Sequence, residues 1–248
     1  MINHALQDLS MAGVCWELSE EATKQVVKQK PIQQSFQTNQ AKTENTVIIP
    51  PTAPISLATV KSMVERPENP EALIRMVAEF NHPLRSGATN VVLPNIATNP
   101  NGLLIITDMP SSDDDLSGQI LSGNAGDMVD KMLSAIEMSR ENVSIVPLLF
   151  WRTPGGRTPT REELDLSKPF VDKLIQMINP RVIITFGTLA TTEISGCSLN
   201  DAHGQEITND IGIIVVPIYH PNYLILKPSA KRDVWSALQN VQKLLKNV

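Results

Sequence analysis

Four short apolar runs, each bounded by turn-forming residues, constrain the fold of this chain more than any other feature. Each run is long enough for one buried strand, and the segments between and after the runs carry apolar residues at helical spacing. Continuous apolar strands that alternate with amphipathic helices are typical of a parallel sheet covered on both faces. The pattern therefore predicts an α/β domain. The four predicted strands are Leu103–Ile106, Val143–Leu149, Val182–Phe186 and Ile213–Ile218.

Composition divides the chain into three parts. Residues 1–18 place apolar side chains at helical spacing and predict a short helix, whereas residues 19–54 are rich in Gln, Lys, Thr, Asn and Pro and predict a polar flexible linker. From residue 55 to residue 248 the pattern is that of a globular domain, in which Pro70 is expected to open a helix. Hydrophobic residues make up 42% of the chain but aromatics only 4%, so the core must be mainly aliphatic.

Several protein classes are excluded by composition. No apolar run approaches the roughly 18 residues of a membrane helix, and the amino terminus lacks the basic-then-apolar pattern of a secretory signal. We therefore expect a cytoplasmic protein without membrane association, and we expect it to be monomeric. Cys15 and Cys197 form no C-x-x-C pair, which argues against a zinc finger or a thiol redox site. The net charge of −5 excludes a generally basic nucleic-acid coat but not a local basic groove.

Chargeable side chains follow the predicted strands, where ligands of open α/β sheets bind. Asp108 comes shortly after the first apolar run and His220 shortly after the fourth. Such a pair suits the attack of water on a cationic sugar. The carboxylate orients the water and balances the positive charge, while the imidazole stabilises the departing anion. A lone histidine at a strand end is also compatible with a purely structural hydrogen-bonding role.

Three further carboxylates, Asp113, Asp114 and Asp115, follow two serines. They are compatible with an exposed turn or helix start. They are also compatible with metal binding, because hard cations prefer oxygen ligands. No matching carboxylate cluster follows another predicted strand, so we expect no metal site.

The segment after His220 combines a proline turn with aromatic and basic side chains. That mixture suits contact with a phosphate backbone and an unstacked base. Lys231 and Arg232 are equally compatible with simple solvation of the final helix. The predicted DNA contacts in this segment are Asn222, Lys227, Lys231 and Arg232.

A second basic segment, WRTPGGRTPTREEL, holds Arg157 on a tight turn. Arg157 is a further candidate phosphate ligand. Thr158 or Thr160 is expected to cap the helix that follows, since threonine is a favoured residue at that position.

Several collinear segments together resemble the uracil-DNA glycosylase superfamily, and specifically its family 4 branch. They are GRTPT, a helix beginning KPF, NPRVIITFGTLA, YHPNYLILKP and KRDVW, and the resemblance covers about residues 70–245. It implies a three-layer α/β/α domain with a central four-stranded parallel sheet. It also implies cleavage of the N-glycosidic bond of deoxyuridine in DNA after the base is flipped out of the stack.

The resemblance also implies site residues. The family's first motif, Gly-Glu-Ala/Gly-Pro-Gly, falls on Thr107 to Ser111, so Asp108 keeps the carboxylate with one methylene fewer. Asp114 matches a further acidic position and His220 the histidine of the last motif. The implied catalytic residues are thus Asp108, Asp114 and His220. The implied base pocket consists of Met109, Pro110, Leu121 and Pro147.

Two of these pocket positions depart from the family pattern. Leu121 replaces the phenylalanine on which the family stacks uracil, and it offers no aromatic face. Pro147 replaces the asparagine that reads the polar edge of uracil. A site without that hydrogen-bond partner is expected to discriminate uracil poorly.

The family's four cluster cysteines are missing as well. The last aligns with Ser167, the third falls near Trp151, and the early pair falls around Glu79 to His82. These side chains are not expected to hold an iron–sulfur cluster. We therefore expect no cofactor, and an apolar or hydrogen-bonded repacking of that corner.

Three functional hypotheses follow. The first is a metal-free DNA glycosylase acting on DNA that contains a deaminated base, with Asp108 positioning water and His220 stabilising the leaving base. The second is a relic that keeps the fold and DNA binding, or only a structural role, without cleavage. The third is a superfamily member with a different base as substrate, which the altered pocket suggests.

Overall fold

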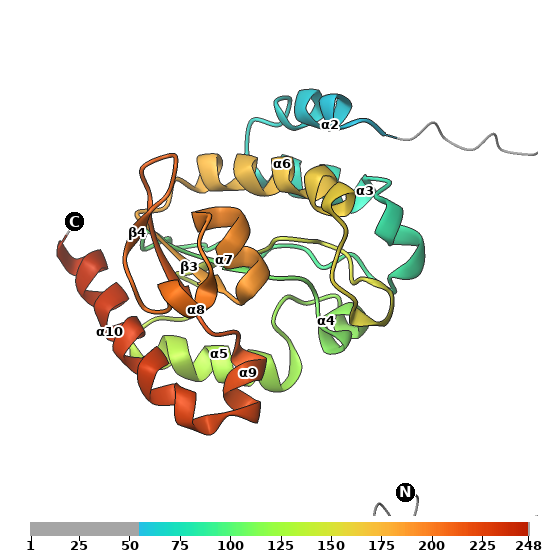
Figure 1. The fold of residues 1–248 in the computed structure, drawn as a ribbon. Helices are drawn as coiled ribbons and strands as arrows, with labels where there is room; N and C mark the ends of the chain where they lie inside the picture. Colours follow the sequence, from blue (N-terminus) through green and yellow to red (C-terminus); the bar gives the residue numbers. More distant parts are fainter. Residues whose placement is uncertain (1–54, 248) are drawn as a thin grey trace, which may run out of the picture. The chain divides into compact units, whose positions relative to one another are not determined.

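The computed structural model describes residues 55–247, so the predicted helix at 1–18 and the predicted linker at 19–54 lie outside the described residues. Helices surround a central sheet (Figure 1). The strands are β1 (Leu103–Thr107), β2 (Ser144–Pro147), β3 (Val182–Phe186), β4 (Ile207–Thr208) and β5 (Ile214–Ile218). The α-helices are α2 (Leu57–Val64), α3 (Pro70–Glu79), α4 (Ser112–Ser117), α5 (Gly123–Ala135), α6 (Arg161–Ile178), α7 (Thr188–Ser195), α8 (Leu199–Ala202), α9 (Pro221–Leu226) and α10 (Lys231–Asn247), and short 3₁₀ turns are η1 (Pro83–Gly87), η2 (Pro154–Gly156) and η3 (Pro228–Ala230).

The sheet has the strand order β2-β1-β3-β5-β4. The four predicted strands pair in parallel, as expected, and β4 adds a short fifth strand that runs antiparallel to β5. β4 is not apparent from the sequence because it is only two residues long and one of them is exposed. The second predicted strand is shorter than expected. After Pro147 the chain bends across β1, and the Leu148 N–H donates to the carbonyls of Thr107 and Asp108.

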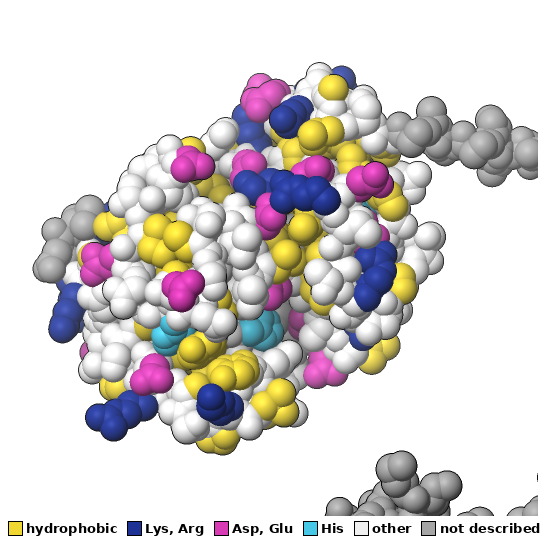
Figure 2. All heavy atoms as spheres, in the orientation of Figure 1, with side chains coloured by type: hydrophobic (Ala, Val, Ile, Leu, Met, Phe, Trp, Pro, Cys, Tyr) yellow, Lys and Arg dark blue, Asp and Glu magenta, His cyan; other side chains and the backbone are white. Residues whose placement is uncertain are grey.

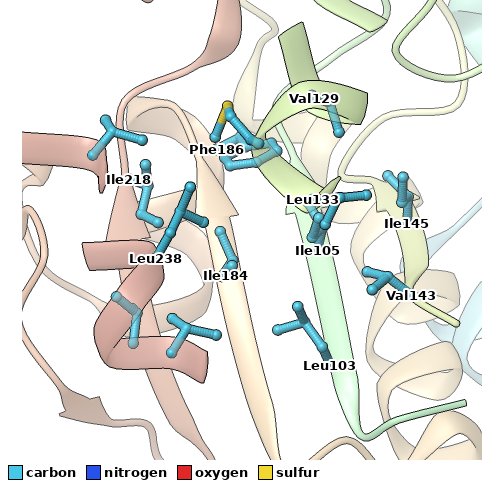
Figure 3. Packing of buried hydrophobic residues seen from close by; sticks show 14 of the residues in the cluster. Leu103, Ile105, Val129, Leu133, Val143, Ile145, Ile184, Phe186, Ile218 and Leu238 are labelled. Atoms are coloured by element: carbon cyan, nitrogen blue, oxygen red, sulfur yellow. The ribbon is translucent and has the colours of Figure 1, made fainter. Parts of the chain in front are cut away.

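Two hydrophobic clusters cover the two faces of the sheet, which confirms the three-layer prediction. On one face α5, α9 and α10 pack against the odd-numbered side chains of β1, such as Leu103 and Ile105 (Figure 3). On the other face α2, α3, α6 and α7 pack against Leu104 and Ile106. The clusters are mostly aliphatic, as predicted, but the second also contains Phe80, Phe150, Trp151 and Phe170.

Local sequence determines where the helices begin. Asn69 caps α3 by accepting from the Ala72 N–H at 2.8 Å, and Pro70 takes the first helical position, as predicted. Thr160 caps α6 in a reciprocal arrangement with Glu163. Within the described part of the chain, no helix is both long and apolar enough to span a membrane.

Candidate active site at the carboxyl edge of the sheet

The register of the sheet brings Asp108 and His220 to the same edge. Thr107 of β1 pairs with Phe186 of β3, which in turn pairs with Ile218 of β5. Asp108 therefore leaves the sheet one residue past this row and His220 two residues past it. Because β3 alone separates β1 from β5, the backbones of these two strands are about 10 Å apart.

The Asp108 carboxylate is tied to the N-terminus of α7. Its Oδ1 accepts from the Ala190 N–H at 2.7 Å, and α7 has no side-chain cap of its own. Burial raises the pKa of Asp108 to about 6, although backbone N–H groups of Ala190, Leu189 and Thr188 oppose this change. A carboxyl with that pKa is mostly ionised at neutral pH and is still basic enough to take a proton from water.

Gly187 makes room for this carboxylate. A Cβ at residue 187 would lie 2.2 Å from Asp108 Oδ2, and the backbone there has φ +98°. With ψ 175°, this conformation belongs to a region that only glycine occupies readily. Residue 187 therefore has to be glycine for two reasons: its backbone conformation disfavours other residues, and a Cβ would clash with the Asp108 carboxylate.

His220 is held as a neutral imidazole of defined tautomer. Its Nδ1 accepts from the Asn222 N–H at 3.2 Å, which leaves the proton on Nε2. Burial lowers the pKa of His220 to about 4, and the nearby Asp114 carboxylate opposes this effect. At neutral pH the ring can thus donate a hydrogen bond from Nε2 without carrying a charge.

Asp114 organises the loop between β1 and α5. The carboxylate is buried and accepts hydrogen bonds from the Ser111 N–H at 2.9 Å and from the Ser122 N–H at 2.6 Å and hydroxyl at 2.8 Å. The first of these closes a capping box at the start of α4. These contacts hold the loop together, and the Asp114 charge lies close enough to influence His220. The predicted catalytic role of Asp114 stays a prediction.

Leu121 is held in a left-handed conformation, with φ 50°. Its carbonyl accepts from Arg140 Nη2 at 2.7 Å, and the neighbouring carbonyl of Ile120 accepts from Arg140 Nη1 at 2.9 Å. Strain of this kind persists only where surrounding contacts enforce it. Here they direct the Leu121 side chain into the cluster on the α5 side of the sheet.

The four predicted pocket residues do not all lie on one face. Pro147 ends β2 on the strand beside Thr107, and by strand alternation it faces the same side as Ile145 and Leu121. Met109 packs against the opposite cluster, where its Sδ accepts from the Thr153 hydroxyl at 3.4 Å. Pro110 is buried next to it. Leu121 and Pro147 thus face one side of the sheet and Met109 packs on the other, so the predicted base pocket of these four residues stays a prediction.

The predicted DNA contacts fall into two groups. One group is exposed and follows His220 in the chain: Asn222 on α9, Lys227 between α9 and η3, and Lys231 and Arg232 at the start of α10. Lys227 Nζ lies 5.7 Å from the centre of the Tyr223 ring. Arg157 instead forms a bidentate ion pair with Glu163, with Nη1 2.8 Å from Oε2 and Nη2 2.5 Å from Oε1. A phosphate would therefore have to compete with that carboxylate for Arg157.

Two features of the segment around His220 are not apparent from the sequence. His203 stacks on Tyr219 with ring centres 4.0 Å apart, and Tyr219 lies 4.9 Å from Tyr223, so three rings support the His220 turn. Leu226, at the end of α9, is 85% exposed. An apolar run in a sequence gives no sign of which member faces solvent, so only the structure could identify it.

The corner that corresponds to the family's iron–sulfur site is filled by side chains. The His82 ring stacks on Trp151, with centres 4.5 Å apart and planes within 5°, and Nε2 of His82 bonds the Glu163 carbonyl at 3.0 Å. The Ser167 hydroxyl donates to the Leu148 carbonyl at 2.7 Å. These groups do not fit a cluster that needs thiolates. Among residues 55–247 no group of three or more His, Cys, Asp or Glu side chains is arranged to hold a metal ion.

A hollow of about 830 Å³ lies beside this corner, bordered by α2, η1 and the start of α6. Its lining includes Ile55, His82 and Glu163 but neither Asp108 nor His220. It is therefore separate from the sheet edge at which Asp108 and His220 lie.

Comparison with known proteins identifies the family of this chain. The chain is 27% identical to a Type-4 uracil-DNA glycosylase of Archaeoglobus fulgidus over 172 residues, which cover 65% of this chain and 85% of the relative. It is 29% identical to a Type-4 uracil-DNA glycosylase of Thermotoga maritima over 171 residues, or 66% of this chain and 88% of the relative. The family model for the uracil DNA glycosylase superfamily matches residues 95–240, a range that includes β1, α7 and His220. The chain belongs to the uracil-DNA glycosylase superfamily.

Proposed function

We propose that this protein is a DNA glycosylase that hydrolyses the N-glycosidic bond of uracil or another deaminated base in DNA. The observation that carries the proposal is the placement of a partly buried carboxylate and a neutral imidazole at one edge of the sheet. The two relatives described above are named for uracil-DNA glycosylase activity, which supports the same reaction class.

In the proposed reaction the bond between the sugar C1′ and the base nitrogen breaks, and its electron pair leaves with the base. The ionised Asp108 balances the positive charge on the sugar, orients a water molecule and accepts its proton as the water oxygen bonds C1′. His220 donates a hydrogen bond from Nε2 to a carbonyl oxygen of the departing base, which stabilises its negative charge. No metal ion is needed for any of these steps.

The surface around His220 suits a DNA strand with a base rotated out. Tyr223, Ile225 and Leu226 expose apolar surface on α9, and Lys227 follows directly. On the face drawn in Figure 2, histidine side chains lie beside hydrophobic ones, with Lys and Arg side chains at the border. An apolar side chain as exposed as Leu226 can fill the gap that a flipped base leaves in the stack.

The proposal predicts that the purified protein converts a deaminated base in single-stranded DNA into an alkali-labile site. Oligonucleotides with one uracil, hypoxanthine or xanthine provide the test, and the matched oligonucleotide with cytosine is the control. Because Leu121 and Pro147 offer no hydrogen bond to a base, we expect cleavage of more than one of the three substrates. Absence of cleavage with all three would refute the proposed reaction.

A second candidate function is DNA binding without cleavage. It is favoured by the bond between Asp108 and the N-terminus of α7, since a carboxylate that caps a helix has a structural role whether or not it acts on substrate. The two candidates share the DNA surface and differ only in base release.

Both candidates predict binding that weakens with salt. Lys231→Ala with Arg232→Ala is expected to reduce the salt dependence of binding by about two released counterions, because each phosphate contact releases condensed cations. Fluorescence anisotropy of labelled DNA at several salt concentrations measures this. Lys243→Ala, which removes an exposed charge from the far part of α10, is the control. An unchanged salt slope in the double variant would place the DNA elsewhere on the surface.

A further inference from the structure

Thr107, the last residue of β1, buries a hydroxyl group that lacks a hydrogen-bond partner. Its side chain is 3% exposed, and Oγ1 has no partner among the described residues. A buried hydroxyl without a partner is unfavourable, so such groups are rare and call for an explanation. Buried ring nitrogens of Trp151 and His203 also lack a hydrogen-bond partner among the described residues. Neither residue, however, ends a strand at the edge of the sheet where Asp108 lies.

Thr107 lies in the row of strand ends at the edge of the sheet from which Asp108 leaves. Thr107 lies between Pro147 on β2 and Phe186 on β3, and neither of those side chains has a polar atom. By strand alternation Thr107 faces the same side as Leu103 and Ile105, the side on which Leu121 is buried. In sequence it directly precedes Asp108.

We propose that the Thr107 hydroxyl is the group that reads the base. It donates its hydrogen bond to a carbonyl oxygen of a deaminated base that packs against Leu121. Deamination replaces an amino group with such an oxygen, so the hydroxyl meets the feature that deaminated bases have in common. This inference rests on the proposed function and names the substrate class of the same site.

The chemistry of one hydroxyl also predicts a broad range of accepted bases. A hydroxyl donates one hydrogen bond in a direction that can rotate, whereas a side-chain amide presents a fixed donor and acceptor pair. Uracil, hypoxanthine and xanthine all carry a carbonyl oxygen and therefore satisfy the hydroxyl alike. The expected site is one of broad tolerance among deaminated bases.

Two substitutions separate the hydroxyl from the shape of the side chain. Thr107→Val keeps the branched shape and removes the hydroxyl, and Thr107→Ser keeps the hydroxyl. The probe is a single-stranded oligonucleotide with one 2′-fluoro-2′-deoxyuridine, whose fluorine slows bond cleavage by disfavouring a cationic sugar. A matched oligonucleotide with a tetrahydrofuran abasic residue has no base to read.

Thr107→Val is expected to weaken binding of the fluorouridine probe by roughly 3- to 10-fold, the effect of one lost hydrogen bond, and to leave abasic binding unchanged. Thr107→Ser is expected to stay within roughly twofold of the unmodified protein on both probes. The melting temperature of the Val variant should be unchanged or higher, because the variant removes an unpaired buried hydroxyl.

The outcomes distinguish this inference from the proposed function. If the unmodified protein cleaves uracil-containing DNA but shows no preference for the fluorouridine probe over the abasic one, the role of Thr107 is refuted and the glycosylase proposal stands. Absence of cleavage with uracil, hypoxanthine and xanthine would refute both. If the unmodified protein shows a preference that survives in Thr107→Val, the role of Thr107 is refuted and the glycosylase proposal stands. Equal weakening on both probes in Thr107→Val would reveal a structural role and would also refute the inference.

Discussion

Asp108→Asn is expected to slow base release by a factor of about 10² to 10⁴ at neutral pH without unfolding the protein. The amide has nearly the same shape as the carboxyl, and its oxygen can still accept from the Ala190 N–H. It cannot balance a positive charge or take a proton from water. Single-turnover release of the base measures the effect. The matched control is Asp113→Asn, which replaces an exposed carboxylate of α4.

The pH dependence of this variant gives a second test. Since burial raises the pKa of Asp108 to about 6, the rate of the unmodified protein should rise with pH through about 6 and then level off. His220, whose pKa is lowered to about 4, stays neutral over that range and adds no step. Asp108→Asn should lack the rise near pH 6. A variant with the full rate, or with the same rise, would contradict the assigned role.

The raised pKa also has a consequence for stability. A carboxyl whose pKa is higher in the folded state favours folding in its protonated form, so its contribution is complete below the ordinary value of 3.8. That contribution is lost as the pH rises through about 6. Asp108→Asn removes the titration, so the fall in unfolding free energy over this range should be smaller in the variant.

Gly187→Ala is expected to disrupt both stability and activity. Alanine at this backbone conformation costs about 1–3 kcal/mol. The added Cβ would also meet Asp108 Oδ2 at 2.2 Å and displace the carboxylate from the N-terminus of α7. We therefore expect a loss of roughly 2–4 kcal/mol in unfolding free energy and base release close to that of Asp108→Asn. Urea unfolding and single-turnover kinetics measure the two effects.

Gly196→Ala separates the clash from backbone strain. Gly196 ends α7 with φ +70°, and a Cβ there would meet no atom within 4 Å. This variant should lose about 1–2 kcal/mol from its left-handed backbone alone and keep its rate of base release. If Gly187→Ala behaved like Gly196→Ala in both measurements, the close approach between Gly187 and Asp108 would have no functional importance.

Hydrophobic periodicity was sufficient to predict the layers of this fold. The apolar runs became β1, β2, β3 and β5 because each is buried on both faces, and the helical stripes became the helices that cover them. The edge strand β4 was missed because two residues carry no measurable alternation. Strand ends shifted by one or two residues where hydrogen bonds to neighbouring segments, rather than side-chain type, decide where pairing stops.

The candidate site could be predicted only in part. The positions of Asp108 and His220 at strand ends follow from the sequence, because parallel strands end at the same edge. The bond from Asp108 to α7 and the ion pair between Arg157 and Glu163 depend on tertiary placement. Leu121 gave no sign of its left-handed backbone, since that conformation usually signals glycine or asparagine and is here enforced by Arg140.

The most direct test of the account is the amount of free base released from a single-stranded oligonucleotide with one uracil, measured between pH 4.5 and pH 8. The account predicts release that follows one ionisation near pH 6 and nearly disappears in Asp108→Asn. Release that is independent of the Asp108 carboxylate, or no release of uracil, hypoxanthine or xanthine at any pH in that range, would contradict it.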